Sequence, residues 1–338
     1  SFSKEYISSI SGRTQGYTPF LDSIFNHSLV FEKAYANGKK SIEALPAILS
    51  GLPALMNNPL ITSPYAQNRT NSFANILNKE GYHSSFFHGA TNGSMGFDGY
   101  CDVIGFDNYY GRAEYSQEED FDGNWGIYDE PFLDFTAKEL NEFKEPFFSA
   151  VFTLSSHHPY QLPEKYQESF AGGNMEIMKT IEYTDYCLKQ FFESIKNEQW
   201  AKNTLFVFTA DHTAVSADPF YKNRVGIYSI PIAYYKMDGS LAGRNSSVTQ
   251  QIDILPTSLD LIGYNKEFHS FGKSALDSGP GSCVNYISNV YQYFKGDYVL
   301  QYGDDKSLGL FNIRKDSSLL INRMDFEWKR KEAMEREL

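Results

Sequence analysis

The sequence predicts an α/β fold in which helices cover a mostly parallel sheet, followed by a small antiparallel appendage. Short β-rich apolar runs alternate with helix-like stretches over most of the chain, which is the pattern of parallel sheets covered by helices. From Cys283 onward, short alternating segments are separated by Gly-Asp turns, which is typical of antiparallel strands. We therefore expect a main domain over residues 1–282 and a small subdomain with a charged terminal helix over residues 283–338.

Individual elements follow from the same patterns. The β-rich runs predict strands at residues 84–87, 147–154, 204–209 and 230–235. Apolar residues at helical spacing predict helices at residues 71–79, 175–195 and 251–262. The stretch 99–129 is rich in Gly, Asp and Tyr and has weak periodicity, so we expect a long functional loop there. The tail 325–338 is expected to form a charged helix that is mostly solvated.

Composition restricts the possible partners. A formal charge of −12 argues against nucleic acid, because binding to its phosphates requires a basic surface. It leaves an anionic small substrate open, since a metal ion can invert the local field. Cys101, Cys187 and Cys283 are odd in number and far apart, so they imply neither a disulfide framework nor a zinc knuckle. With no apolar run of about 18 residues, the sequence as given is expected to be soluble.

Three predicted strands end in residues that carry chemistry. The strand at 84–87 runs into His88, the strand at 147–154 leads to His157, and the strand at 204–209 leads to Asp211 and His212. Because ligands bind at the carboxyl ends of strands in open α/β sheets, we expect one polar site at this edge. Asp211 and His212 are candidate ligands of a divalent cation. The alternative is a turn aspartate beside a surface histidine.

A second candidate centre is the segment around Ser41. Apolar residues on one face predict a helix that begins near Ser41 and tolerates Pro46 close to its start. A helix N-terminus favours an anion, so Ser41 is a candidate metal-activated nucleophile flanked by Lys39 and Lys40. The alternative is that Ser41 is only the helix N-cap.

Several motifs, taken together in order, resemble the alkaline phosphatase/sulfatase superfamily over roughly residues 14–276. They are Thr18-Pro-Phe-Leu-Asp22, Phe31-Glu-Lys-Ala-Tyr35, Gly38-Lys-Lys-Ser41, Thr209-Ala-Asp-His212, Ile230-Pro-Ile, Gln251-Ile-Asp253-Ile-Leu-Pro256 and Phe271-Gly-Lys. The resemblance implies an alkaline-phosphatase-like three-layer α/β/α sandwich, with Ser41 at the position of the nucleophile. Residues 1–282 would then be a sulfatase-like catalytic domain.

Two features of the motifs favour the lipoteichoic acid synthase branch. Ser41 is followed by Ile-Glu-Ala-Leu and lacks the Pro and Arg that accompany formylglycine formation in true sulfatases. A plain Ser after Gly-Lys-Lys is similar to the lipoteichoic acid synthases and their phosphoglycerol-transferase relatives. The segment Ser155-Ser-His157-His-Pro-Tyr160 also resembles this branch, which has a substrate-binding His there.

This resemblance implies a phosphoglycerol transferase that works through a phospho-Ser41 intermediate. Ser41, Asp211 and His212 would hold one divalent metal ion, with Mn preferred and Mg or Zn as alternatives. Lys39, Lys40, His88, Trp125 and His157 would bind the substrate. The partners would be a phospholipid headgroup and a glycan or polyol acceptor, and the domain would be monomeric.

The glycerol pocket departs from the branch. Gram-positive synthases carry an aromatic-Asn-Arg segment after the strand that ends here in His88, whereas this chain has Asn92-Gly-Ser-Met-Gly-Phe97. The headgroup therefore remains open, and Trp125 either walls the pocket or serves packing. Two other functions also remain open: a sulfatase or phosphodiesterase that transfers to water, and an inactive lipid- or glycan-binding module.

The N-terminus bears on the metal site and on location. In the branch, the first strand ends in a Glu ligand immediately before Ser-Phe, and this chain begins with Ser1 and Phe2. We expect that this Glu and its strand lie upstream, and that Glu5 does not replace it. Relatives carry transmembrane helices upstream, so we expect the native enzyme at the cell membrane with this domain outside the cytoplasm.

Overall fold

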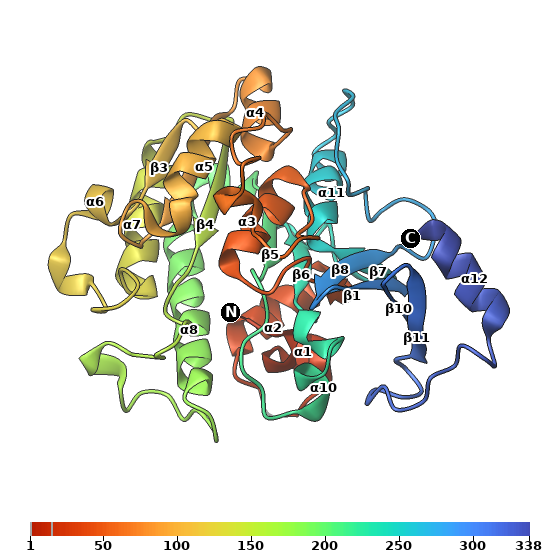
Figure 1. The fold of residues 1–338 in the computed structure, drawn as a ribbon. Coiled ribbons are helices and arrows are strands. Elements are labelled where there is room, and N and C mark those ends of the chain that lie inside the picture. The colour runs from red at the N-terminus through yellow and green to blue at the C-terminus, as the bar shows by residue number, and fades with distance from the viewer. Residues whose placement is uncertain (1, 15) are drawn as a thin grey trace. The chain divides into compact units, whose positions relative to one another are not determined.

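The computed structural model describes residues 2–14 and 16–338, so the expected cut at Ser1 lies outside the described residues (Figure 1). The chain forms two compact units, each described by itself. Unit 1 comprises Ser1–Leu29, Tyr65–Phe206 and Tyr234–Gly243. Unit 2 comprises Val30–Pro64, Val207–Ala233 and Arg244–Leu338.

Unit 1 contains a parallel sheet of three strands in the order β3-β2-β4. The central strand β2 (His83–His88) pairs in parallel with β3 (Asn108–Tyr110) and with β4 (Phe147–Phe152). In the second pair His88 lies opposite Phe152, so both strands end at the same edge. Helices α7 (Asp129–Glu142) and α8 (Ile177–Ile195) pack against each other. The strands predicted at 84–87 and 147–154 and the helix predicted at 175–195 are therefore confirmed.

The prediction of a long loop at residues 99–129 is wrong for the first half of this stretch. Helix α5 (Phe97–Ile104) and strand β3 begin there, and the short helix α6 (Arg112–Tyr115) follows. Phe97, Tyr100, Cys101 and Ile104 are buried at helical spacing. Glycines and aspartates between these positions obscure the period, and packing of the apolar face decides the structure.

The sheet in the order β5-β6-β1-β7 lies mainly in unit 2. Its strands are β5 (Phe206–Thr209), β6 (Ile232–Tyr235), β1 (Leu29–Tyr35) and β7 (Gly243–Gln250). Helices α3 (Ser41–Ser50) and α11 (Ile254–Leu261) pack together in the same unit. The strands predicted at 204–209 and 230–235 and the helix predicted at 251–262 are present. Strands β1 and β7 were missed, since their polar and charged residues dilute the apolar pattern.

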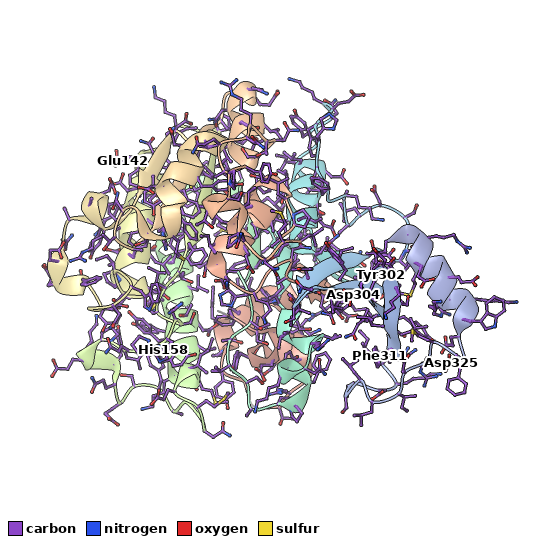
Figure 2. The ribbon with its side chains drawn as sticks, in the orientation of Figure 1. Glu142, His158, Tyr302, Asp304, Phe311 and Asp325 are labelled. Atoms are coloured by element: carbon purple, nitrogen blue, oxygen red, sulfur yellow. The ribbon has the colours of Figure 1, made fainter. Side chains whose placement is uncertain are left out.

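The end of unit 2 is the expected antiparallel appendage. Four strands in the order β11-β10-β9-β8 pair antiparallel (Figure 1). They are β8 (Cys283–Ile287), β9 (Val290–Lys295), β10 (Tyr298–Gly303) and β11 (Lys306–Asn312). Figure 2 labels Tyr302 on β10 and Phe311 on β11. The sheet begins at Cys283, and the domain boundary at 282 stays a prediction.

Helix α12 (Trp328–Glu337) confirms the predicted charged terminal helix. Of its residues only Met334 is buried, in a cluster with Tyr293, Leu300 and Leu310. The remaining helices are short and complete the two units: α1 (Ser8–Ser11), α2 (Pro19–Asn26), α4 (Phe73–Leu77), α6, α9 (Gln199–Lys202) and α10 (Pro219–Lys222). Among the described helices, none combines the length and apolarity that crossing a bilayer requires.

A buried carboxylate fixes the start of α2 in unit 1. Asp185, on α8, accepts hydrogen bonds from the backbone N–H groups of Phe20 (2.9 Å) and Leu21 (2.8 Å). These are first-turn groups that the helix itself leaves unpaired. Burial raises the pKa of Asp185 to about 6, although the two N–H donors oppose the shift. An acid from a distant helix therefore caps α2.

Asp185 predicts a pH-dependent stability. A carboxyl whose folded-state pKa lies above its unfolded value, near 4, contributes stability that is complete below pH 4 and is lost as pH rises through about 6. We expect the free energy of unfolding of the wild type to fall across this range relative to that of Asp185→Asn, which cannot ionise. Urea unfolding of both proteins from pH 4 to pH 7 measures the difference. Parallel profiles would contradict the prediction.

Candidate active site

Ser41, Asp211 and His212 converge within unit 2. The Ser41 hydroxyl donates to Asp211 Oδ2 at 2.7 Å, and its Oγ lies 3.5 Å from His212 Nε2. His212 Nε2 lies 3.1 Å from the same carboxylate oxygen. Ser41 and Asp211 are each only 7% exposed. The fold therefore brings together the three residues that the sequence analysis selected from two distant segments.

The position of Ser41 excludes the N-cap alternative. Lys40 occupies the N-cap position in an extended conformation, and Ser41 is the first helical residue of α3. No side chain caps this end of the helix, and the Ser41 hydroxyl is engaged with Asp211. The hydroxyl oxygen therefore lies at the positive end of a ten-residue helix, where a negative charge is stabilised.

The donor set suits a divalent cation in part. A hydroxyl oxygen, a carboxylate oxygen and an imidazole nitrogen lie within 2.7–3.5 Å of one another, close enough to share one ion. His212 Nδ1 lies 2.6 Å from the Thr213 carbonyl oxygen, which leaves Nε2 as the ligand atom. Within residues 2–14 and 16–338, no group of three or more His, Cys, Asp and Glu side chains is positioned to hold a metal. The three donors thus fit part of a coordination sphere.

The neighbours of Asp211 favour its carboxylate form and orient it. Burial by itself would raise the pKa of this carboxyl. Interactions with His212 and the hydrogen bond from Ser41 lower the pKa and oppose that effect. Asp211 Oδ1 also accepts the backbone N–H of His212 at 2.8 Å. Hydrogen bonds to both carboxylate oxygens therefore orient Asp211.

A buried amide network links the segment before Ser41 to the segment that carries Asp211. Gln251 is fully buried, and its Nε2 donates to the carbonyl oxygens of Ala210 (2.8 Å) and Asp211 (2.7 Å). Its Oε1 accepts the backbone N–H of Asn37 at 2.9 Å. The Asn37 side chain donates to Gln250 Oε1 and accepts from the Ile252 N–H. One glutamine thus ties together the two chain segments that meet at the site.

The turn between Asn37 and Ser41 requires glycine and presents two cations. A Cβ at Gly38 would lie 2.5 Å from Glu43 Cβ, closer than side chains approach one another. Glu43 in turn accepts the backbone N–H of Lys39 at 2.7 Å. The side chains of Lys39 and Lys40 are exposed next to Ser41 in the sequence. Their assignment to substrate binding stays a prediction.

His88 lies in an aromatic environment within unit 1. Its ring is fully buried and lies 5.1 Å from the Phe97 ring and 5.2 Å from the Phe152 ring, between centroids. Nδ1 is 2.9 Å from the Tyr109 hydroxyl, and Nε2 has no hydrogen-bond partner among the described residues. Burial lowers the pKa of His88 to about 4, so the ring is neutral at pH 7. Substrate contact by His88 stays a prediction that requires the ring to be uncovered.

Trp125 and His157 form a second cluster in unit 1. Their ring centroids are 4.2 Å apart. Trp125 Nε1 donates to the carbonyl oxygen of His158, the residue labelled in Figure 2, at 2.7 Å. The Trp125 side chain is 37% exposed, so it combines packing with an accessible face. Two residues predicted to bind substrate therefore lie side by side, and their role in binding stays a prediction.

Asp129 holds the segment that carries His157. It accepts the backbone N–H groups of Leu154 (2.7 Å) and Ser155 (3.0 Å) and the hydroxyl of Thr184 (2.9 Å). Burial raises the pKa of this carboxyl, against these donors. The sequence analysis overlooked Asn37, Asp129 and Gln251 as contributors to the site. Gln251 could have been found from its place in a family motif, whereas no sequence pattern pointed to Asn37 or Asp129.

A hollow of about 990 Å³ in unit 1 is a different kind of surface. It is lined by residues of α7, α8 and the segments 119–128 and 163–165, including Glu119, Asp120, Glu130 and Asp134. Its one cation, among the lining residues described, is Lys165, whose Nζ lies 2.7 Å from Glu130 Oε2. An acidic hollow repels phosphate and sulfate, so it does not compete with Ser41 as a site for an anionic ester.

The family assignment rests on comparison with known sequences. The sequence profile of the Sulfatase family matches residues 1–264. The chain belongs to the sulfatase family. It is therefore an enzyme domain of the sulfatase-family kind, and the predicted likeness to this superfamily is confirmed.

Curated relatives carry the names lipoteichoic acid synthase and lipoteichoic acid synthase-like. The lipoteichoic acid synthase-like protein YvgJ of Bacillus subtilis (strain 168) is 25% identical over 308 residues, covering 82% of this chain and 49% of the relative. Lipoteichoic acid synthase of Staphylococcus aureus (strain USA300) is 24% identical over 282 residues, covering 77% of this chain and 42% of the relative. The chain spans about half the length of the curated relatives that it matches.

Solved structures confirm the fold. An alkaline phosphatase superfamily protein from Vibrio parahaemolyticus superposes with a TM-score of 0.81 at 25% identity, covering 92% of this chain and 76% of that one. The lipoteichoic acid synthase LtaP of Listeria monocytogenes gives 0.84 at 20% identity, covering 100% and 88%. The sulfatase-family chain thus has the predicted alkaline-phosphatase-like α/β fold.

The amide network predicts that Gln251 is a positioning residue for Asp211. In Gln251→Leu the carbonyl oxygens of Ala210 and Asp211 and the N–H of Asn37 lose their partner while they remain buried. We expect the protein to lose about 2–4 kcal/mol of stability. We also expect reduced metal affinity, because Asp211 is displaced. Urea unfolding and calorimetry with Mn²⁺ measure the two effects.

The matched control is Gln67→Leu, which makes the same chemical change at an exposed position. It should change stability by no more than about 0.5 kcal/mol. Equal behaviour of the two variants would show that the network does not hold the site.

Proposed function

We propose that this chain is the catalytic domain of a metal-dependent transferase that moves a phosphoglycerol-type group from a phospholipid to an acceptor hydroxyl. The observation that carries the proposal is the contact between the Ser41 hydroxyl and Asp211 Oδ2, with His212 Nε2 beside it, at the start of α3. The names of the curated relatives, lipoteichoic acid synthase and lipoteichoic acid synthase-like, support the proposal.

The reaction follows from a nucleophile at a helix start. Ser41 Oγ attacks phosphorus, its proton is lost, and the bond from phosphorus to the diacylglycerol oxygen breaks as that oxygen gains a proton. An acceptor hydroxyl then attacks phospho-Ser41, loses its own proton and regenerates the serine. The first turn of α3 stabilises the phosphorylated side chain, and Lys39 and Lys40 add positive charge nearby.

One divalent ion, with Mn preferred and Mg or Zn as alternatives, would be held by Ser41, Asp211 and His212. When bound, it would lower the pKa of the serine hydroxyl and polarise the phosphoryl oxygen. Asp211 orients the hydroxyl through the 2.7 Å hydrogen bond. His88, Trp125 and His157 stay proposed substrate-binding residues.

The proposed setting follows from the resemblance to lipoteichoic acid synthases. In this proposal the enzyme uses a phospholipid donor and a glycan or polyol acceptor at the cell membrane, with its catalytic domain outside the cytoplasm, and the domain is monomeric. Transfer to water, as in a sulfatase or phosphodiesterase, is the second candidate, and it is favoured by the family match itself. Two reactions distinguish these candidates. In one the protein is incubated with fluorescent phosphatidylglycerol and an acceptor, and in the other it is incubated with an aryl sulfate.

Loss of the nucleophile gives the most direct test. Ser41→Ala is expected to reduce turnover of phosphatidylglycerol by several orders of magnitude, because no phosphoserine can form. The helix start tolerates Ala, and losing the hydrogen bond to Asp211 is expected to cost about 1–2 kcal/mol. A folded Ser41→Ala protein with ordinary kinetics would show that Ser41 is not the nucleophile.

Metal binding gives an independent test. Calorimetry with Mn²⁺ is expected to show weak binding, because three donors with one carboxylate leave the ion undercharged and open to water. Asp211→Asn should abolish the remaining heat of Mn²⁺ binding, since it removes that carboxylate. Tight stoichiometric binding by the wild type would show that the site is complete as it stands, and unchanged binding by Asp211→Asn would place the ion elsewhere.

A further inference from the structure

Strand β8 has one edge that faces away from its sheet, because it stands last in the order β11-β10-β9-β8. In a strand, the N–H and the C=O of one residue point to the same side. The Val284 N–H donates to Gln250 Oε1 at 3.1 Å, and the Val284 carbonyl oxygen accepts a hydrogen bond from Asn37 Nδ2 at 2.9 Å. Two side-chain amides therefore pair with Val284 as a neighbouring strand would. We call this side of β8, which carries Val284 and Tyr286, the outer edge.

The outer edge also contacts the chain segment that follows His212. The Tyr286 carbonyl oxygen accepts a hydrogen bond from the Tyr228 hydroxyl at 2.9 Å, and the Tyr228 side chain is fully buried. The carbonyl oxygen of the preceding residue, Ile227, accepts the Thr213 hydroxyl at 2.6 Å. The Thr213 carbonyl oxygen in turn lies 2.6 Å from His212 Nδ1. The outer edge is thus linked to both chain segments that meet at the site.

Asn37 is saturated with hydrogen bonds in one arrangement only. It is fully buried, and its Nδ2 donates to Gln250 Oε1 at 2.8 Å as well as to Val284. Its Oδ1 accepts the backbone N–H of Ile252 at 3.1 Å, and its own N–H donates to Gln251 Oε1 at 2.9 Å. Turning the amide over would place oxygen against two carbonyl oxygens and Nδ2 against an N–H. The network therefore fixes both the place and the orientation of Asn37.

The turn from Asn37 to Ser41 is short and stiff. Three residues separate the two, and a Cβ at Gly38 would lie 2.5 Å from Glu43 Cβ. The Glu43 carboxylate also accepts the Lys39 N–H at 2.7 Å. A displacement of Asn37 is therefore passed on to the start of α3. Misplacing a reacting group by about 1 Å can cost on the order of 100-fold in rate.

We propose that the outer edge of β8 positions both chain segments of the site, the turn before Ser41 through Asn37 and the segment after His212 through Tyr228. Asn37 and Tyr228 are then positioning residues, because their hydrogen bonds run to protein groups. The inference rests on the proposed function where it takes Ser41 as the nucleophile. It makes the appendage part of the catalytic scaffold.

Hydrogen exchange of the full chain tests the positioning without any turnover. Asn37→Asp keeps the size and the Oδ1 of the side chain, but it replaces Nδ2 by an oxygen that faces two carbonyl oxygens. We expect the amides of residues 38–44 to exchange about tenfold faster than in the wild type, because the turn opens more easily. Asn312→Asp is the matched control, since Asn312 is also buried in unit 2 but uses Oδ1, which aspartate keeps.

Turnover separates a positioning role from a merely structural one. With Mn²⁺ and fluorescent phosphatidylglycerol, Asn37→Asp should lower kcat about 10–100-fold and leave KM unchanged. Lower stability with a wild-type kcat per folded molecule would overturn the inference, and so would wild-type exchange at residues 38–44. If the wild type does not turn over phosphatidylglycerol, the proposed function fails, whereas faster exchange in Asn37→Asp still supports positioning by β8.

Tyr228→Phe tests the second contact and is expected to fold, because it removes one hydroxyl only. The amides of residues 212–216 should exchange severalfold faster, since the Tyr286 carbonyl oxygen loses its donor. Tyr302→Phe makes the same change on β10, at a residue labelled in Figure 2, and should leave this exchange as it is in the wild type. Equal exchange in the two variants would overturn the role of Tyr228.

Discussion

The hydrogen bond from Ser41 to Asp211 joins residues 170 positions apart in the chain, and the site depends on it. Each partner is weak by itself, since a serine hydroxyl is a poor nucleophile and a buried carboxylate is unfavourable without compensation. Brought together, the hydroxyl stabilises the charged carboxylate, and the carboxylate orients the hydroxyl. Gln251 supports this pairing, because its amide satisfies backbone groups on both segments. Removing that amide would leave several buried polar groups unpaired at once.

Unit 1 uses the same principle with carboxylates. Asp129 fixes the segment leading to His157, and Asp185 caps α2 from a distant helix. Burial raises the pKa of both carboxyls, because it disfavours their charged form. The cost of burying the charge offsets part of the stability that the hydrogen bonds provide. Such groups hold loops in place at some cost, which is reasonable for segments that carry candidate binding residues such as His157.

The appendage shows a different balance. Its buried cluster stabilises the antiparallel sheet and α12, while Leu320, Phe326 and Trp328 stay exposed. Exposed apolar area lowers solubility unless something covers it, and a left-handed Leu319 adds conformational cost.

The sequence by itself predicted the α/β class, four strands of the main sheets, and Ser41, Asp211 and His212 as candidate site residues, because periodicity and strand-end residues are local features. It failed for α5, where Gly and Asp mask a buried apolar face that only packing reveals. It did not indicate that aromatic rings bury His88, or that Asn37 and Gln251 brace the site. Those outcomes depend on hydrogen bonds and packing between segments distant in the chain, which no local pattern encodes. Tertiary structure alone decided which polar residues became buried partners and which apolar ones stayed exposed.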